Sequence, residues 1–270
     1  MRARSVSRRE FLQVGAMIMA GVDAMAGQRG AAPAGGVSVK ALVFDTFGTV
    51  VDWRTSVTRD VQELAKRKGV TLDAAAFADA WRAAYGPSMN RVRTGELPWT
   101  KLDALHRMSL EKILVQFKLP ALTETEKDTL NRAWHRLQPW PDAVSGLTRL
   151  KKKFIIAPLS NGNISLMTDL AKYAGLPWDC ILGAELARHY KPDREVYQSA
   201  ADILDLPVAQ VMMVAAHLGD LRAAKNVGLR TAFVTRPLEY GPDRKPDLKP
   251  DASVDVSATD FNDLAARLGA

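Results

Sequence analysis

The chain has 270 residues, 47% of them hydrophobic and 25% charged, a balance typical of a globular protein with a sizeable core in one domain or in one domain with an insertion. The formal net charge of +7 is spread along the chain, and in the absence of a basic stripe or a recognition motif we expect no nucleic-acid partner. Cys180 is the only cysteine in the sequence, which excludes an intramolecular disulfide and a zinc site built from cysteines.

Residues 1–26 have the character of an export signal. Arg8 and Arg9 form the pair of a twin-arginine signal, and a moderately apolar run over residues 14–22 follows them. Residues 24–26 (Ala-Met-Ala) fit the small-x-small rule for cleavage, and the apolar run is too short to span a bilayer. We therefore expect export to the periplasm without stable membrane insertion. The alternative is a disordered basic leader.

The folded part of the chain is expected to begin near Val39. Residues 27–38 are mostly small and follow neither a helical nor a strand period, which predicts a flexible linker. The apolar run over residues 40–44 ends at Asp45 and predicts a buried parallel strand.

Residues 54–137 have a helical character. They are rich in Ala, Leu, Arg and Glu, with apolar residues at helical spacing, which predicts about four helices. Gly86-Pro87 and residues 95–98 (Gly-Glu-Leu-Pro) divide them. Because this block follows the first strand and precedes the others, we expect it to be an inserted helical cap.

Beyond residue 138, apolar runs of strand length alternate with helical segments. The predicted strands are 154–159, 180–182, 211–214 and 231–234, and the predicted helices are 143–152, 164–174, 193–205 and 220–227. Such alternation indicates a parallel sheet with helices on both faces. The predicted fold is therefore α/β, with a Rossmann-like core formed by residues 39–53 and 138–270 and a cap formed by residues 54–137.

The carboxyl ends of the predicted strands carry the candidate functional residues, because active sites of open parallel sheets lie at that edge. This rule selects residues 45–49, residues 160–161, the segment around Lys191 and residues 215–220. A carboxylate such as Asp45 can attack carbon or phosphorus when it is held ionised and aimed. A single aspartate at a strand end would more often only cap a turn, but four polar segments at one edge favour catalysis.

These four segments resemble, in the same order, the four motifs of the haloacid dehalogenase superfamily. Residues 44–50 (Phe-Asp-Thr-Phe-Gly-Thr-Val) match the first motif and residues 159–162 (Leu-Ser-Asn-Gly) the second. Lys191-Pro192-Asp193 with Tyr197 resembles the third, and residues 214–220 resemble the fourth. Four ordered motifs form a specific signal where any one alone would be weak. The resemblance implies a nucleophile at Asp45.

Two positions indicate the branch of the superfamily. Its magnesium-dependent phosphatases carry an acidic residue two places after the nucleophile and another four places before the last aspartate; here Phe47 and Ala216 stand there. Magnesium needs hard oxygen ligands, and a halide leaves without a proton donor. The sequence is therefore most similar to the 2-haloacid dehalogenase (type II) branch, which implies a short 2-halocarboxylate and water as reactants, with neither metal nor cofactor.

The resemblance also implies a role for each group around the nucleophile. Asp45 would form an aspartyl ester, and the Thr49 hydroxyl would hold its carboxylate. Lys191 would keep Asp45 ionised, because a nearby positive charge favours the charged form of a carboxyl group. Tyr197 would position Lys191 or the substrate carboxylate, and Asp220 would support Lys191 and the hydrolytic water.

A second group is expected to bind the substrate. Ser160 and Asn161 would bind its carboxylate, and Phe47 would form an apolar wall around its alkyl part. Arg82, which follows Trp81 on a predicted cap helix, would receive the halide or the carboxylate, because a guanidinium offers several donors and is always charged.

Some features remain open at the level of sequence. His217 stands where well-known members of the branch have asparagine, and it is either the base for the hydrolytic water or a side chain that only hydrogen-bonds its loop. The size of the substrate is also open, because Gly86 and Gly219 stand at positions where bulkier pocket residues are common in this branch. A homodimer is plausible by resemblance alone. The alternative functions are a magnesium-dependent phosphatase or phosphonatase of the same superfamily and a non-catalytic binding protein on the same fold.

Overall fold

The computed structural model describes residues 38–119, 121–242, 244, 246–250 and 252–270. The predicted signal at residues 1–26 and nearly all of the predicted linker lie outside the described residues, so export stays a prediction. Among the described residues, no helix is both long enough and apolar enough to cross a membrane.

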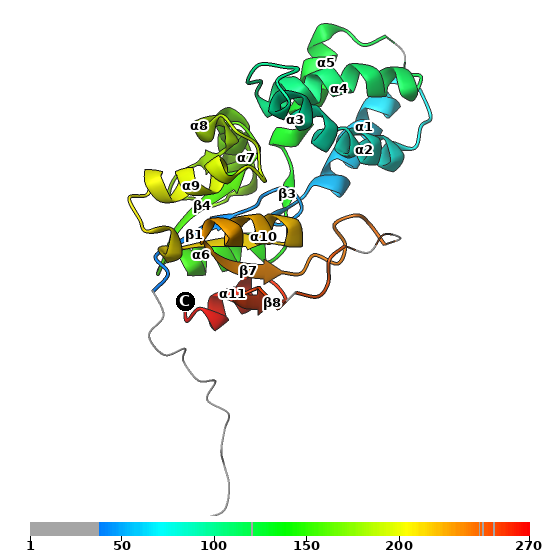
Figure 1. Cartoon of the computed structure of the whole chain (residues 1–270). Helices are drawn as coiled ribbons and strands as arrows, with labels where there is room; N and C mark the ends of the chain where they lie inside the picture. The colour runs from blue at the N-terminus through cyan, green and yellow to red at the C-terminus, as the bar shows by residue number, and fades with distance from the viewer. Residues whose placement is uncertain (1–37, 120, 243, 245, 251) are drawn as a thin grey trace, which may run out of the picture. The chain divides into compact units, whose positions relative to one another are not determined.

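The predicted parallel sheet is confirmed. Within the described residues, its six strands follow the order β5-β4-β1-β6-β7-β8, with β1 in the interior between β4 and β6. Figure 1 labels β1, β4, β7 and β8 of this sheet. All neighbouring strands in this sheet run parallel. The strands are β1 (Ala41–Phe44), β4 (Ile155–Ser160), β5 (Leu182–Gly183), β6 (Val211–Ala215), β7 (Arg230–Val234) and β8 (Val256–Ala258).

Helices cover both faces of this sheet, as the sequence predicts for an α/β core. Side chains alternate between the faces of a strand, so Val43 packs in the same cluster as Val196 of α9, and Leu42 packs in the same cluster as Leu147 of α6. The helices on the first face are α9 (Arg194–Ile203) and α10 (Leu218–Val227). Those on the second face are α6 (Ala143–Lys151), α7 (Ile164–Ala174) and α11 (Phe261–Arg267), and the short α8 (Ala184–Ala187) follows β5.

The helical segment begins and ends at a short antiparallel pair of strands. β2 (Val51–Asp52) leads out of the core and β3 (Gln138–Pro139) leads back beside it. Between them lie α1 (Trp53–Lys68), α2 (Ala74–Ala83), α3 (Tyr85–Arg93), α4 (Leu102–Gln116), α5 (Glu124–Asn131) and the 3₁₀ turn η1 (Arg132–His135) (Figure 1). We call this segment, residues 54–137, the helical cap.

Local sequence explains where the cap helices begin and end. Asp52 caps α1 by accepting a hydrogen bond from the Thr55 amide, and Gly69 ends the helix in the left-handed conformation at φ 64°. Thr123 and Glu126 form a capping box at the start of α5. Against the prediction of about four helices, the described part of the cap has five α-helices, because a turn at Ala84 separates α2 from α3 and leaves Gly86-Pro87 in the first turn of α3.

A cluster of buried aromatic rings joins the cap to the loop after β1. Trp134 lies at its centre, with ring centroids 5.9 Å from Phe47, 5.5 Å from Trp81 and 4.5 Å from His106. Burial is the main reason why the pKa of His106 is lowered to about 3. The ring is therefore neutral and packs as a flat aromatic. The cluster therefore ties the cap to the loop that carries the nucleophile candidate.

The contact between α6 and α11 leaves no room for a methyl group at Gly146. A Cβ there would lie 2.4 Å from the Phe261 Cβ and 2.7 Å from its carbonyl carbon. We expect Gly146→Ala to lower the free energy of unfolding by about 1–3 kcal/mol, because overpacking outweighs the gain of about 1 kcal/mol in helix propensity. Urea unfolding measures it. Gly219→Ala on α10, where nothing lies within 4 Å, is the control and should be neutral or stabilising. Equal stability of both variants would contradict this packing.

Candidate active site

Asp45 lies at the carboxyl end of β1, where the amide of this residue bonds the Val214 carbonyl at 3.0 Å. Its Oδ2 accepts hydrogen bonds from the Thr49 hydroxyl at 2.7 Å and from His217 Nδ1 at 2.9 Å, and its Oδ1 accepts one from Lys191 Nζ at 2.9 Å. Burial alone would raise the pKa of Asp45, but the Lys191 ammonium and the bonds from His217 and Thr49 hold it well below its usual range. The carboxylate is therefore ionised at neutral pH.

Lys191 bridges two carboxylates. Its ammonium lies 2.5 Å from Asp220 Oδ2 as well as 2.9 Å from Asp45 Oδ1, and Tyr197 donates to the second oxygen of Asp220 at 2.5 Å. Burial would lower the pKa of Lys191, but Asp220 and Asp45 raise it, so the side chain stays an ammonium. Its backbone amide donates to Asn161 Oδ1 at 2.7 Å, which joins the second and third motif segments.

The position between Asp45 and Asp220 is thus filled by an ammonium group. A divalent cation at this position would have to displace Lys191. Ala216, at the position where the phosphatases carry an acidic residue, has no ligand atom in its side chain. Across the described residues, no three or more His, Cys, Asp or Glu side chains are grouped so that they could hold a metal ion.

His217 stands at the start of α10 with both ring nitrogens against carboxylates. Nδ1 contacts Asp45, and Nε2 lies 3.0 Å from each oxygen of Glu239. Burial would lower the pKa of His217, but these two hydrogen bonds raise it to about 10. The ring is therefore a double donor at neutral pH. The sequence leaves open whether His217 is a base or a side chain that only hydrogen-bonds its loop. A ring that donates through both nitrogens cannot accept a proton, and its partners are Asp45 and Glu239.

A cavity of about 350 Å³ opens onto these groups. It brings together most of the predicted site residues, namely Asp45, Arg82, Asn161, Lys191, Tyr197, His217 and Asp220. The remaining part of its wall is formed by Tyr85, Gly86 and Met89 of α3 and by Pro192 and Gly219.

Three predicted site residues do not line this cavity. Thr49 is fully buried and acts through Asp45. Ser160 is also fully buried, and its hydroxyl accepts a hydrogen bond from the Gly162 amide at 3.1 Å. Phe47 is 2% exposed and packs against Trp134 of the aromatic cluster instead. Phe47 therefore does not form the predicted apolar wall of the cavity. The Ser160 hydroxyl, predicted to bind the substrate carboxylate, does not line the cavity either.

Arg82 enters the cavity from the end of α2. Its guanidinium lies 4.2 Å from the ring centroid of Tyr85 and 5.5 Å from that of Trp53. Its Nη1 is buried and makes no hydrogen bond within the part of the chain that the structure describes. An unsatisfied buried donor carries a cost in free energy, and a charged donor carries more. The cavity is thus lined by a guanidinium, a group that binds anions well.

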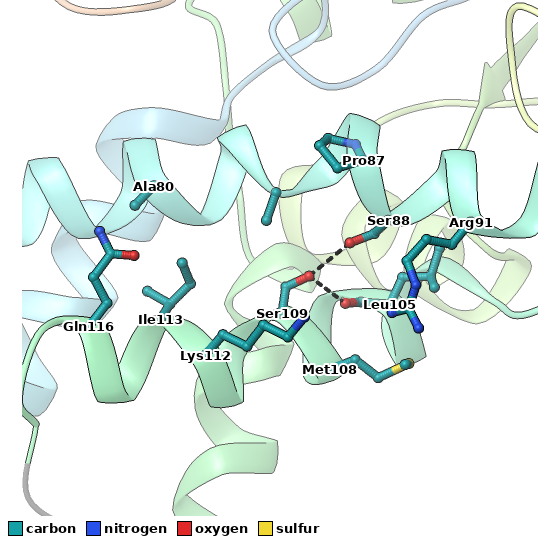
Figure 2. Close-up of a pocket in the computed structure, with 11 residues that line it drawn as sticks. Ala80, Pro87, Ser88, Arg91, Leu105, Met108, Ser109, Lys112, Ile113 and Gln116 are labelled. Atoms are coloured by element: carbon teal, nitrogen blue, oxygen red, sulfur yellow. Dashed lines mark hydrogen bonds between the residues drawn. The ribbon is translucent and has the colours of Figure 1, made fainter. Parts of the chain in front are cut away.

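The helical cap holds a second cavity, of about 570 Å³, between α2, α3 and α4 (Figure 2). The hydroxyls of Ser88 and Ser109 in its wall are hydrogen-bonded to each other at 2.9 Å, and Ser109 donates to the Leu105 carbonyl at 2.9 Å (Figure 2). Arg91 and Lys112 supply charge at its wall, but no carboxylate, histidine or cysteine lines it. It therefore lacks a base that could activate either serine.

Sequence reasoning misses Glu239, Tyr85 and Met89. Glu239 lies in the turn after β7, five residues past the strand end, so the strand-end rule could have found it. Tyr85 follows Arg82 by three residues, a spacing that brings side chains to one side of a helical segment, and Met89 lies one turn further.

Comparison with known proteins finds haloacid dehalogenases and hydrolases similar to them. Residues 39–228 match the family model of haloacid dehalogenase-like hydrolases. The chain is 30% identical to (S)-2-haloacid dehalogenase 4A of Burkholderia cepacia over 217 residues, which cover 75% of this chain and 87% of that protein. It is also 30% identical to (S)-2-haloacid dehalogenase 1 of Pseudomonas sp. (strain CBS-3) over 216 residues, which cover 75% and 88%.

Two solved structures resemble this one over most of their length. The defluorinating L-2-haloacid dehalogenase Rha0230 is 51% identical with a TM-score of 0.83, covering 86% of this chain and 96% of that chain. The L-2-haloacid dehalogenase PA0810 is 48% identical with a TM-score of 0.81, covering 86% of this chain and 100% of that chain.

Proposed function

The chain belongs to the haloacid dehalogenase-like hydrolases, and we propose that it hydrolyses short 2-haloalkanoic acids to 2-hydroxy acids through an aspartyl ester on Asp45. One observation carries this proposal. The ionised Asp45 faces a small cavity that is also lined by Arg82, whose buried Nη1 has no hydrogen-bond partner among the described residues. The named activities of the relatives support the same reaction.

The cavity suits a small monoanion. Its lining carries cations at Arg82, Lys191 and His217 against carboxylates at Asp45 and Asp220, which attracts an anion. Arg82 would bind the halide or the substrate carboxylate, together with the amide of Asn161. Tyr85 and Met89 would contact the alkyl part. A volume of about 350 Å³ stands near the lower end for small-molecule sites and favours short chains.

The reaction proceeds in two steps. Asp45 Oδ1 attacks C2 of the substrate in line with the carbon–halogen bond, the C–O bond forms, and the halide leaves with the bonding electron pair. Water then attacks Cγ of the ester, and the Cγ–Oδ1 bond breaks. The 2-hydroxy acid leaves with inverted C2 and the former Asp45 oxygen, Asp45 returns as a carboxylate, and one proton passes to solvent. Asp220, which lines the cavity, is the carboxylate available to the attacking water.

The magnesium-dependent phosphatase that the sequence leaves open is less well supported. A phosphatase needs an acid for its leaving alkoxide, whereas a halide needs none. Phe47 offers no such acid, and it is buried between the rings of Trp134 and Tyr85. The ammonium of Lys191 also stands between the two carboxylates that would otherwise be free to ligate a cation.

Halide release tests the proposed function. We expect equimolar halide and 2-hydroxy acid from chloroacetate, bromoacetate, fluoroacetate or (S)-2-chloropropionate, with (R)-lactate as the product of the last. In a single turnover with excess enzyme in ¹⁸O-water, the product should carry no label and the peptide containing Asp45 should become labelled. Label that passes directly into the product, or turnover of p-nitrophenyl phosphate with magnesium but of no 2-haloacid, would contradict the proposal.

A further inference from the structure

Glu239 is a fully buried carboxylate for which none of the four motif segments provides a role. It lies in the turn after β7, and both of its oxygens are 3.0 Å from His217 Nε2. Oε1 also accepts a hydrogen bond from the Trp53 indole at 3.3 Å. A buried carboxylate is costly unless it is paired, so its position beside a histidine that contacts the nucleophile calls for an explanation.

The loop after the nucleophile leaves space for this carboxylate. Gly48 adopts φ +90°, and a Cβ built there would lie 2.1 Å from Glu239 Oε1 and 2.4 Å from its Cδ. Any other residue at this position would therefore push Glu239 away from His217, besides being strained in its own backbone. The first motif and the turn after β7 are thus fitted to each other around the carboxylate.

The hydrogen bonds on Asp45 distinguish its two oxygens. A carboxylate oxygen has two lone pairs in the plane of the group. On Oδ2, the Thr49 hydroxyl and His217 Nδ1 take both of them. On Oδ1, Lys191 takes one, and no other described residue donates to this oxygen. Oδ1 is therefore the nucleophilic oxygen, and Oδ2 becomes the carbonyl oxygen of the ester.

We propose that Glu239 is a positioning residue that orients His217 as a donor to Asp45 Oδ2, so that His217 and Thr49 together form the oxyanion site for hydrolysis of the aspartyl ester. This inference rests on the proposed function. When water attacks Cγ, the C=O bond becomes a C–O⁻ bond and negative charge develops on Oδ2. Both donors already point at that atom in the free enzyme, so they need no reorganisation as the charge appears.

The charge state of His217 agrees with this role. Its pKa is raised to about 10 by Asp45 and Glu239 against the effect of burial, so the ring keeps both protons at neutral pH. Burial and the neighbouring Glu239 raise the pKa of Tyr240 to about 12, so this phenol stays neutral as His217 titrates. Lys191, which faces the other oxygen of Asp45, stays an ammonium. The Arg82 guanidinium lines the same cavity.

The Glu239→Gln variant separates the two steps of the reaction. Gln keeps the shape of the side chain but removes the charge that holds His217 protonated and oriented. We expect ester hydrolysis to slow by about 10- to 100-fold, less than the 100- to 1,000-fold that loss of an oxyanion donor costs, while formation of the ester changes by less than about threefold. With 2-chloropropionate, halide should appear in a burst of one equivalent per site, and the Asp45 peptide should carry the propionate group.

The pH profile provides a readout that a merely structural role would not change. Loss of the Glu239 charge lowers the pKa of His217 below its value of about 10. The hydrolysis step of Glu239→Gln should therefore decline with rising pH earlier than that of the wild type. Glu185→Gln is the control, because this carboxylate also has two partners, the Ile164 amide and Lys101, but neither of them contacts Asp45. It should show neither a burst nor a shifted profile.

A double variant keeps the test decisive if Glu239→Gln folds poorly. His217→Asn with Glu239→Gln leaves no unpaired charge and should hydrolyse the ester as slowly as His217→Asn alone, because Glu239 acts through His217. Equal slowing of both steps, a wild-type pH profile in Glu239→Gln, or an additive loss in the double variant would overturn the inference. If the wild type releases no halide from any 2-haloacid, the proposed function itself fails, which is a separate result.

Discussion

Replacing Asp45 with asparagine is expected to lower kcat for halide release by about 10⁴-fold or more, because the enzyme loses the atom that bonds to substrate carbon. The amide is isosteric with the carboxylate but is neutral and a poor nucleophile. Its oxygen can still accept a hydrogen bond from Thr49 or Lys191, so the local structure should persist. The loss should therefore fall on chemistry and not on folding.

The measurement is halide release from chloroacetate at saturating substrate, with mass spectrometry to confirm that the introduced amide has not hydrolysed back to a carboxylate. Thermal unfolding of the same sample shows whether the variant is folded. Asp60→Asn is the matched control, because Asp60 is similarly buried and pairs with Arg59 and Arg136 on the cap side, away from the cavity. It should keep near wild-type kcat. An Asp45→Asn variant with a tenth or more of wild-type activity would show that another group is the nucleophile.

The core of the fold follows from local sequence because buried parallel strands are continuous apolar runs. The runs around Val43 and Leu159 end at Asp45 and Ser160, and the run around Val214 leads within a few residues to His217 and Asp220. Because the carboxyl ends of parallel strands meet at one edge, the sequence predicts that these polar segments lie together. Helices α7 and α9 likewise begin within one residue of the predicted starts.

Other features depend on contacts between distant parts of the chain. β2 and β3 are two residues long each, too short for alternation to be recognised. Phe47 was expected at the cavity because it follows the nucleophile by two residues, but the aromatic cluster around Trp134 offers it a fully apolar site. The strand-end rule could have placed Glu239 near the site, but it pairs with a residue 22 positions away, and no local pattern indicates which histidine a carboxylate will meet.

Replacing Lys191 with methionine is expected to lower kcat/KM by about 10³-fold and to introduce an acid limb in its pH profile. Methionine keeps most of the length of the side chain and removes the charge. In the wild type the ammonium lies against Asp45 and Asp220, and it holds the pKa of Asp45 well below its usual range. Without it, the two carboxylates repel each other, and burial favours the protonated form of one of them.

The sign of the pH effect follows from the active form. Asp45 must be ionised to attack carbon, and a higher pKa means that activity is lost as pH falls through a higher value. The wild type should keep its activity well below pH 5, where unperturbed carboxyl groups titrate, whereas Lys191→Met should decline there. His217 still lowers the pKa of Asp45 in the variant, so the acid limb should shift without Asp45 becoming neutral at pH 7.

Lys191→Arg distinguishes the charge from the exact position of the donor. Arginine keeps a positive charge between the two carboxylates but cannot place a single nitrogen as the ammonium does. We expect it to lose part of kcat/KM yet to keep the wild-type acid limb, because that limb reports the charge beside Asp45 and not the geometry of attack. Initial rates of halide release between pH 4 and pH 9, with circular dichroism of each variant at each end of the range, make the comparison. If Lys191→Met and wild type have the same acid limb, the ammonium does not control the ionisation of Asp45, and His217 with Thr49 must hold the nucleophile charged without it.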